Sequence, residues 1–202
     1  MKKINRLGII LLAAGASQRM GRAKQLLPID GEPLIVRTIN TLLALPDAEL
    51  LVVLGAHAEQ IRPVIQDLPV QSIVNSNWSE GMGTSLASGV RFFQQKPPVV
   101  EAIMVTVVDQ PFLQTAFLTE LLQQFKTGEH PVAAAVYQDA LGVPAIFSSD
   151  FFDFLIQSSG DKGARRWLMQ HADKVRRVPF EKGEFDLDTP EQYRAFLKER
   201  GS

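Results

Sequence analysis

The sequence predicts an α/β protein in three layers, in which a mostly parallel, twisted sheet carries helices on both faces and has a small antiparallel addition. Two observations support this fold class. Apolar, strand-like runs alternate with amphipathic helical patterns through nearly the whole chain, and such alternation is typical of βαβ units. Residues 136–147 break this rhythm, because two strand-like pieces meet there with no helical pattern between them. That break predicts a hairpin.

The predicted strands are short apolar runs, bounded by polar or turn-forming residues. In chain order they are Leu7–Ala13, Glu49–Leu54, Val70–Val74, Ala102–Val108, Val132–Val136, Pro144–Phe147 and Lys174–Val178. The hairpin joins the fifth and sixth of these strands across residues 137–143. Amphipathic spacing predicts helices over Pro33–Leu45, Ala58–Asp67, Thr84–Gln95 and Thr115–Phe125.

Two further helical segments follow the hairpin. Residues 150–170 have a helical pattern that is interrupted at residues 158–161. The last helix has a clear start, with Thr189 as its N-cap, Pro190 in its first position and Gln192 completing a capping box.

Composition narrows the class of protein. Of the 202 residues, 46% are hydrophobic, which is typical of a folded domain with a proper core. The formal net charge is −1, so no basic field favours nucleic acid or a membrane surface. Cysteine is absent, which excludes disulfides and thiolate metal sites. No apolar run reaches the roughly 18 residues of a membrane span, and we expect a cytoplasmic protein.

A loop of small residues follows the first predicted strand. It contains Gly15 and Gly21 and the cations Arg19, Arg22 and Lys24. Small residues let backbone N–H groups approach phosphate oxygens, and nearby cations balance their charge. The loop therefore predicts a nucleotide-phosphate site, with a solvated turn as the alternative. Its spacing matches neither a Walker A loop nor the G-x-G-x-x-G pattern.

Carboxylates stand at two places where they could hold a metal ion. Asp109 ends an apolar strand on the edge of the sheet where the loop lies, and ligands of open α/β sheets bind at that edge. Mg²⁺ takes one or two carboxylates together with phosphate oxygens and water. Asp186 and Asp188 share one face if their segment is extended, so one of them could reach the same metal. The alternative for each aspartate is to cap a helix.

A third unusual segment, residues 74–86, enters a helix through Gly-Met-Gly. It carries many hydrogen-bonding side chains, and the free N–H groups at a helix start suit a small polar ligand. The alternative is a loop that needs glycine only for its backbone conformation.

These motifs together resemble a known family. The pattern LAAGxSxRMGxxKxLLP is similar to the signature loop of the MobA-like nucleotidyltransferases, and closest to that of the molybdenum cofactor cytidylyltransferases. The resemblance implies a Rossmann-like nucleotidyltransferase fold and a single nucleotidyltransferase domain over residues 1–202. It also implies roles for site residues: phosphate contacts and catalysis for Arg19 and Lys24; nucleotide binding for Ala13, Ala14, Gly15, Gly21, Gly83 and Ser85; and Mg²⁺ binding for Asp109, which is also catalytic, and Asp188.

The resemblance also suggests the substrates. Relatives that transfer GMP usually carry two glycines where this chain has Ala13-Ala14, so the alanine pair points to CTP. The segment 159–165 resembles a GDxGAR motif, in which Lys162 or Arg165 could contact an anionic acceptor; the alternative is a helix start capped by Asp161. The family pattern often has a polar residue where this chain has Val143, which leaves the acceptor in doubt.

The implied reaction is Mg²⁺-dependent transfer of CMP from CTP to the terminal phosphate of a molybdopterin-type cofactor, with release of pyrophosphate. The implied partner is a molybdenum hydroxylase or its maturation factor. Three alternatives stay open: transfer from GTP, transfer to a sugar or alcohol phosphate, and a carrier that binds the cofactor without catalysis.

Overall fold

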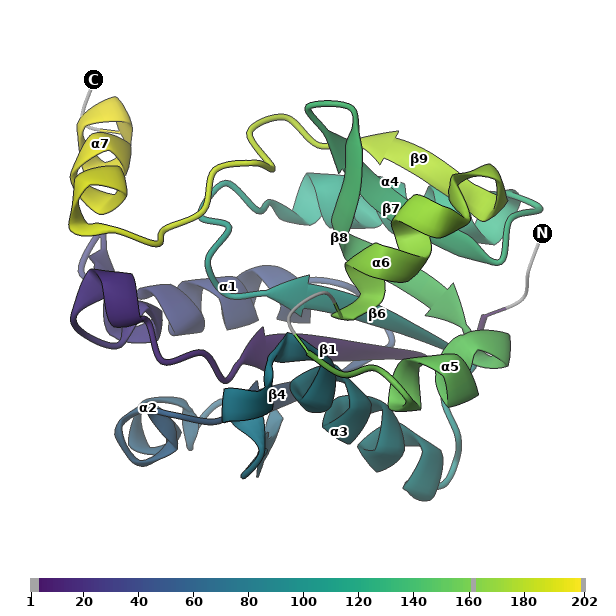
Figure 1. Ribbon diagram of the computed structural model, residues 1–202, viewed down its shortest axis with the longest axis horizontal. Helices are drawn as coiled ribbons and strands as arrows, with labels where there is room; N and C mark the ends of the chain where they lie inside the picture. Colours follow the sequence, from purple (N-terminus) through teal and green to yellow (C-terminus); the bar gives the residue numbers. More distant parts are fainter. Residues whose placement is uncertain (1–3, 161–162, 201–202) are drawn as a thin grey trace.

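Strand β1 (Leu7–Ala13) lies inside a seven-stranded sheet and is buried along its whole length. The computed structural model, which describes residues 4–160 and 163–200, shows helices on both faces of this sheet (Figure 1). Ile9 and Leu11 pack on one face, and Ile10 and Leu12 pack on the other. A strand covered on both sides needs apolar residues at every position, which explains its continuous apolar run.

The sheet has the strand order β5-β4-β1-β6-β8-β7-β9. Strand β1 pairs in parallel with β4 and β6, β4 pairs in parallel with β5, and β7 pairs in parallel with β9. Strand β8 runs antiparallel to both of its neighbours. The bounds of these strands are β4 Ala48–Leu54, β5 Gln71–Val74, β6 Ala102–Val107, β7 Val132–Tyr137, β8 Ala140–Ser148 and β9 Val175–Pro179.

A separate two-stranded ribbon follows the first loop. It consists of β2 (Pro28–Ile29) and β3 (Glu32–Pro33), which are antiparallel. The mostly parallel sheet, the antiparallel strand β8 and this ribbon together confirm the predicted fold class.

The helices divide between two hydrophobic cores, one on each face of the sheet. Residues of α1 (Leu34–Leu43), α2 (Ala58–Ile65), α4 (Thr115–Thr127) and α7 (Pro190–Arg200) pack into the first core. Residues of α3 (Met82–Gln95), α5 (Phe152–Ile156) and α6 (Gly163–Gln170) pack into the second core. Pro63 is accommodated within α2.

The hairpin is tighter than the sequence predicts. Strand β8 begins at Ala140 rather than at Pro144, so the seven-residue connection over 137–143 is wrong. Gln138 and Asp139 alone form the turn, with φ values of 47° and 61°. A two-residue turn with two positive φ angles matches the twist of paired strands. The turn contains no glycine, so nothing in the sequence indicates its two positive φ angles.

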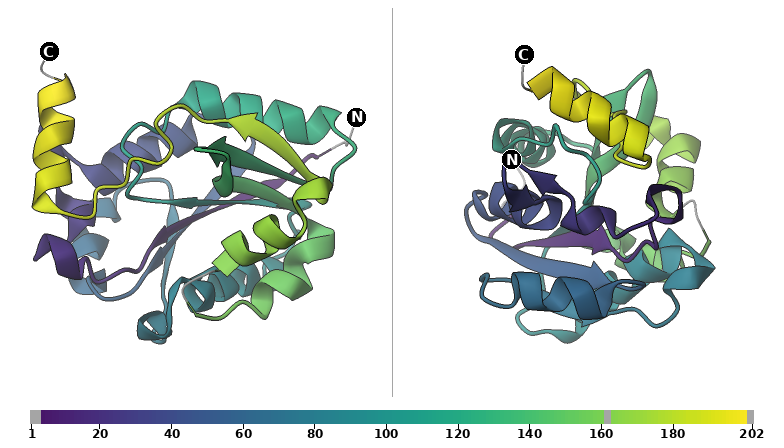
Figure 2. Two further views of the ribbon diagram at one scale, coloured as in Figure 1. Left: turned by 45° about the horizontal axis from the view of Figure 1, so that its top comes forward. Right: turned by 90° about the vertical axis from the view of Figure 1, so that its left-hand side faces the viewer.

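Helix α7 brings the C-terminal segment beside the N-terminal loop. The Tyr193 hydroxyl donates to the carbonyl oxygen of Pro28, and Figures 1 and 2 show α7 next to the segment that follows β1. Residues far apart in the chain therefore meet at this end of the sheet.

Within the part of the chain that the structure describes, no helix is long and apolar enough to span a membrane.

Candidate active site

A cavity of about 480 Å³ opens where β1 and β6 end. Its walls are the loop after β1, the last residues of β6, the start of α3 and the segment before α7. The lining residues are Leu12, Ala13, Ala14, Gly15, Ala16, Ser17, Gln18, Arg19, Lys24, Gln25, Trp78, Ser79, Gly81, Met82, Ser85, Val107, Val108, Asp109 and Asp188. The cavity lies at the carboxyl ends of parallel strands, which is the usual ligand position in such sheets.

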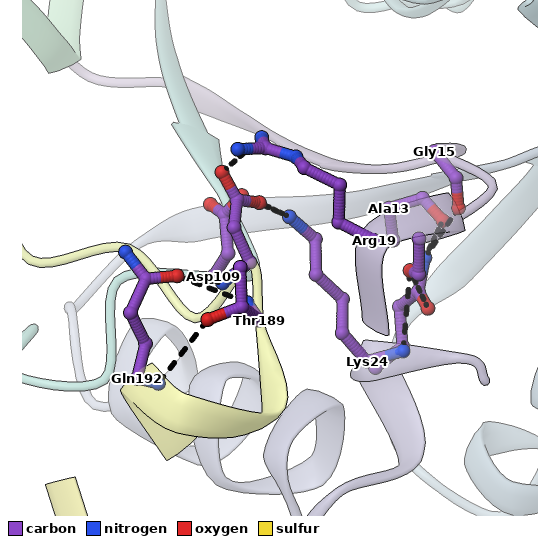
Figure 3. A network of polar contacts seen from close by, with 10 residues as sticks. Ala13, Gly15, Arg19, Lys24, Asp109, Thr189 and Gln192 are labelled. Carbon is purple, nitrogen blue, oxygen red and sulfur yellow. Dashed lines mark hydrogen bonds and ion pairs between the residues drawn. The ribbon is translucent and has the colours of Figure 1, made fainter. Parts of the chain in front are cut away.

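Two cations and two carboxylates meet at one side of this cavity. The Lys24 ammonium lies 2.5 Å from Asp109 Oδ2 and 2.8 Å from Asp188 Oδ1. The Arg19 guanidinium lies 2.5 Å from Asp188 Oδ2. Figure 3 shows Arg19 and Lys24 extending from the loop toward the carboxylates. The structure thus brings together the four charged residues that the sequence analysis singled out for catalysis and metal binding.

The electrostatics of the cluster favour the charged forms of Lys24 and Asp188. Burial alone would lower the pKa of Lys24, but the adjacent Asp109 and Asp188 outweigh burial and raise the pKa above its usual value. Burial alone would raise the pKa of Asp188, but Lys24 and Arg19 outweigh it and lower the pKa. Lys24 and Asp188 therefore stabilise each other in their charged forms.

The segment that carries Asp188 is held by the predicted capping box. Gln192 Oε1 accepts the backbone N–H of Asp188 at 3.0 Å and that of Thr189 at 2.9 Å. In return, the N–H of Gln192 donates to Thr189 Oγ1 at 3.3 Å. In Figure 3 Thr189 and Gln192 lie directly beside the charged cluster. The capping box therefore both starts α7 and places the backbone of Asp188.

Backbone and amide contacts join this segment to the loop after β6. The N–H of Leu187 donates to the carbonyl oxygen of Asp109 at 3.0 Å. The buried Gln110 amide donates to the carbonyl oxygens of Val143 at 3.1 Å and Gly183 at 2.9 Å. The two aspartates thus belong to one hydrogen-bonded unit, although they are far apart in sequence.

Asp186 stands apart from the cavity lining. Its pKa is raised to about 7, first by burial and then by the nearby charges of Asp109 and Asp188, against the smaller opposing effect of Lys24. Tyr137 is in the same neighbourhood, and its pKa is raised by burial and by the charge of Asp186. Capping a helix was the alternative role for Asp186, but the capping bonds at Thr189 come from Gln192.

Asn75 organises the opposite wall of the cavity. It is buried, and its amide donates to Thr84 Oγ1 at 2.9 Å and to Ser85 Oγ at 3.0 Å. Ser85 lines the cavity as predicted, together with Trp78 and Met82, for which the sequence analysis proposed no role. The sequence signal that could have indicated Trp78 and Met82 is their position in the segment 74–86, which enters a helix through Gly-Met-Gly.

Two of the six predicted nucleotide-binding residues lie outside the cavity lining. Ala13, Ala14 and Gly15 line the cavity, whereas Gly21 and Gly83 are not among the lining residues. Gly83 packs against the backbone of Ser159, where a Cβ would come within 2.6 Å of the Ser159 nitrogen, and its N–H donates to Gly160 O. Its lack of a side chain therefore serves a close approach between α3 and the segment before α6.

The predicted acceptor residues are only partly placed. Asp161 and Lys162 lie outside the described residues. Arg165 is exposed on α6, and its charge acts on both Tyr137 and Asp186. The positive charge of Arg165 thus lies close to Tyr137 and Asp186.

Comparison with known proteins identifies the family. A model of the MobA-like NTP transferase domain matches residues 9–175. The chain belongs to this family. The matched domain is an NTP transferase domain, so the chain is by family an enzyme of this general kind.

Two curated relatives match along most of their length. Nicotine blue oxidoreductase of Paenarthrobacter nicotinovorans is 34% identical over 193 residues, covering 91% of this chain and 92% of the relative. The purine catabolism protein PucB of Bacillus subtilis is 32% identical over 198 residues, with the same coverage of 91% and 92%.

Solved structures match just as broadly. Rv0371c from Mycobacterium tuberculosis H37Rv has a TM-score of 0.84 at 26% identity, covering 98% of this chain and 100% of that one. A complex of the same protein with manganese has a TM-score of 0.77 at 23% identity, covering 96% and 98%.

Proposed function

We propose that this MobA-like nucleotidyltransferase is a Mg²⁺-dependent cytidylyltransferase that transfers CMP from CTP to the terminal phosphate of a molybdopterin-type cofactor. One observation carries the proposal: Arg19 and Lys24 reach from the small-residue loop to Asp109 and Asp188 at one side of a cavity large enough for a nucleotide. Cations beside a glycine loop suit a triphosphate, and carboxylates facing them suit its metal ion.

The carboxylate pair fits Mg²⁺. Asp109 Oδ1 is buried and has no hydrogen-bond partner within the described residues, and an unpartnered buried carboxylate oxygen favours a cation. Among these residues no group of three or more His, Cys, Asp or Glu side chains could hold a metal. That agrees with Mg²⁺, which relies on few carboxylates and completes its shell with phosphate oxygens and water. When bound, the ion would neutralise charge on the phosphates.

In the free protein, Lys24 and Arg19 neutralise the two aspartates. When a nucleoside triphosphate binds, we expect both cations to exchange carboxylate oxygens for phosphate oxygens. The Arg19 side chain is 71% exposed, whereas that of Lys24 is 12% exposed and bonds both aspartates. Lys24 is therefore positioned for charge that develops during transfer, and Arg19 for capture of the triphosphate.

The reaction needs no protein nucleophile. An oxygen of the acceptor phosphate, already ionised because its second pKa is about 6, attacks the α-phosphorus of CTP. The new bond joins that oxygen to the α-phosphorus, and the bond from the α-phosphorus to the bridging oxygen breaks to release pyrophosphate. Catalysis is then alignment plus charge stabilisation by Lys24 and Arg19.

The choice of CTP and of the acceptor comes from the family resemblance. Ala13 and Ala14 line the cavity, which is consistent with a role for their methyl groups in limiting the space for a base. Arg165, near Asp186, supplies a cation for an anionic acceptor. One relative is named as an oxidoreductase, so family membership does not by itself define the reaction.

Pyrophosphate release tests the proposal. The protein is incubated with Mg²⁺ and each of the four NTPs, with and without purified molybdenum cofactor, and the product is identified by mass spectrometry. We expect release with CTP only when cofactor is present, together with a cytosine dinucleotide product. An Asp109→Asn variant is the matched control and should lose release.

Other outcomes select the alternatives. Release with GTP would assign guanylyl transfer, and release with a sugar or alcohol phosphate would assign another acceptor. Cofactor binding without any release would favour a carrier. The absence of binding to every NTP would refute the nucleotide site.

A further inference from the structure

The loop after β1 has an unusual hydrogen-bonding pattern. The carbonyl oxygens of Ala13, Ala14, Gly15 and Ala16 each accept a hydrogen bond from a donor outside these four residues. Gln25 Nε2 donates to Ala13 and Gly15, both at 3.0 Å. The backbone N–H of Ala56 donates to Ala14 at 3.0 Å, and His57 Nε2 bonds Ala16 at 2.9 Å.

This pattern fixes the direction of the N–H groups. In a trans peptide the C=O and the N–H of the next residue point in opposite directions. A donor that binds the Gly15 carbonyl therefore turns the N–H of Ala16 away from itself, and His57 does the same for the N–H of Ser17. Neither N–H has a partner within the described residues, and both residues line the cavity. The loop thus offers unpaired donors where an anion would bind.

Gln25 has the chemistry that this arrangement requires. Its side chain is completely buried, and its single amide nitrogen carries two hydrogens, one for each carbonyl. Its Oε1 accepts from the Ser17 hydroxyl at 3.4 Å, and Ser17 Oγ accepts the N–H of Lys24 at 3.2 Å. Gln25 is therefore connected both to the loop carbonyls and to the backbone of the central cation.

His57 completes the arrangement from another element. It lies at the start of α2, where it is the residue before Ala58. A carbonyl oxygen only accepts, so Nε2 must carry the proton in this bond. The position of the loop thus depends on a side chain that follows β4, the strand next to β1.

We propose that Gln25 and His57 are positioning residues that pre-order this loop to receive the polyphosphate of a nucleoside triphosphate. The proposal rests on the assignment of the loop to phosphates under the proposed function. Pre-ordered donors bind an anion more tightly because the loop loses less conformational freedom on binding. The two residues act through their hydrogen bonds to the loop backbone.

The test measures binding of inorganic tripolyphosphate by calorimetry, so that neither the base nor the acceptor matters. Gln25→Met keeps the length of the side chain without its donors and without adding charge. We expect tripolyphosphate to bind about tenfold more weakly, since two hydrogen bonds that order the loop are lost. Gln94→Met is the matched control, because Gln94 lies near the far end of α3 and bonds only the exposed Asp153; it should bind as the wild type does.

A second pair of variants keeps the test informative if Gln25→Met fails to fold. His57→Gln can still donate from an amide near the Nε2 position, whereas His57→Phe keeps a ring without a donor. We expect His57→Gln to stay within about twofold of the wild type and His57→Phe to bind several-fold more weakly. Cytidine, which has no phosphate, should bind all folded variants equally, whereas a merely structural defect would weaken cytidine as well.

The outcomes separate the two proposals. If the wild type binds tripolyphosphate and both Gln25→Met and His57→Phe bind it equally well, the positioning role is wrong and the proposed function stands. If His57→Gln loses as much as His57→Phe, donation by His57 is also refuted. If the wild type binds neither tripolyphosphate nor any NTP, both proposals fail.

Discussion

Lys24 is the residue on which the charge balance of the candidate site depends. Its ammonium bonds both Asp109 and Asp188, so its removal leaves two carboxylates facing each other without their shared counter-charge. The same group is positioned for the developing charge of a transferred phosphoryl group. A change at this residue should therefore affect both stability and rate.

We expect Lys24→Met to lower the rate of nucleotidyl transfer on the order of 10²–10³-fold, by analogy with the loss of one donor that stabilises a transition state. The measurement is pyrophosphate release under saturating substrates. Lys174→Met, at an exposed position outside the cavity lining, is the control and should keep wild-type activity. Retained activity in Lys24→Met would remove Lys24 from the mechanism.

Asp186 gives the chain a pH-dependent stability. Its pKa in the folded protein is raised to about 7 from the usual 3.8 by burial and by neighbouring aspartates. In the unfolded chain the Asp186 carboxyl loses its proton near pH 3.8, whereas in the folded chain it keeps the proton up to about pH 7. Stability is therefore lost as the pH rises from about 4 to about 7 and stays lost above that range.

Asp186→Asn should remove this loss. We expect the variant to exceed the wild type in free energy of unfolding by roughly 1–2 kcal/mol at pH 8, after allowance for solvent screening. The difference should shrink at pH 4.5. Urea unfolding in EDTA at both pH values measures it, and an equal difference at both would contradict the raised pKa.

Among the elements, the capping box of α7 has two functions. Gln192 satisfies the N–H groups of Thr189 and Asp188, so the start of the helix and the position of a site carboxylate depend on one side chain. The sequence predicts this box from Thr189, Pro190 and Gln192 alone. That the box also places Asp188 in a cavity follows only from the structure.

Gln192→Ala should cost about 1 kcal/mol of stability, as for other lost helix caps, and should also slow nucleotidyl transfer by freeing the backbone of Asp188. Gln192→Glu retains acceptor oxygens for a capping box and should restore both properties in large part. Urea unfolding and pyrophosphate release measure the two effects. If Gln192→Ala loses stability but keeps full activity, the cap does not position Asp188.

At the scale of the whole molecule, the site joins the two ends of the chain. Arg19 and Lys24 bond Asp188 over sequence separations of 169 and 164 residues. The C-terminal segment also contributes Leu187, Tyr193 and Phe196 to the core that α1 and α4 cover. A ligand held by both ends should therefore stabilise the entire fold.

Mg²⁺ and CTP at about 100 times the dissociation constant should raise the free energy of unfolding by ~2.7 kcal/mol. In a domain of this size that corresponds to a rise in Tm of about 5–10 °C. Thermal unfolding with and without ligand measures the shift, and the Lys24→Met variant should show little of it. An undiminished shift in that variant would place CTP elsewhere.

Much of the fold can be predicted from local sequence patterns. The strands and helices follow from the period of apolar residues, and the alternation of the two predicts the three-layer fold. Asp109 was expected beside the loop because parallel strands end at one edge of the sheet. The hairpin was predicted correctly, but its connection is shorter than expected, since Gln138 and Asp139 adopt positive φ angles without a glycine to indicate them.

The sequence by itself determined the fold class, the small-residue loop with its cations, the aspartate at a strand end and the start of α7, because each depends on neighbouring residues. Only the tertiary structure decided that Asp188 meets Asp109 on Lys24, that Gln25 and His57 hold the loop carbonyls, and that Asp186 has a raised pKa. These features depend on the path of the chain in space and on burial, since hydrogen bonds and charge interactions act over a few ångströms however distant the residues are in sequence.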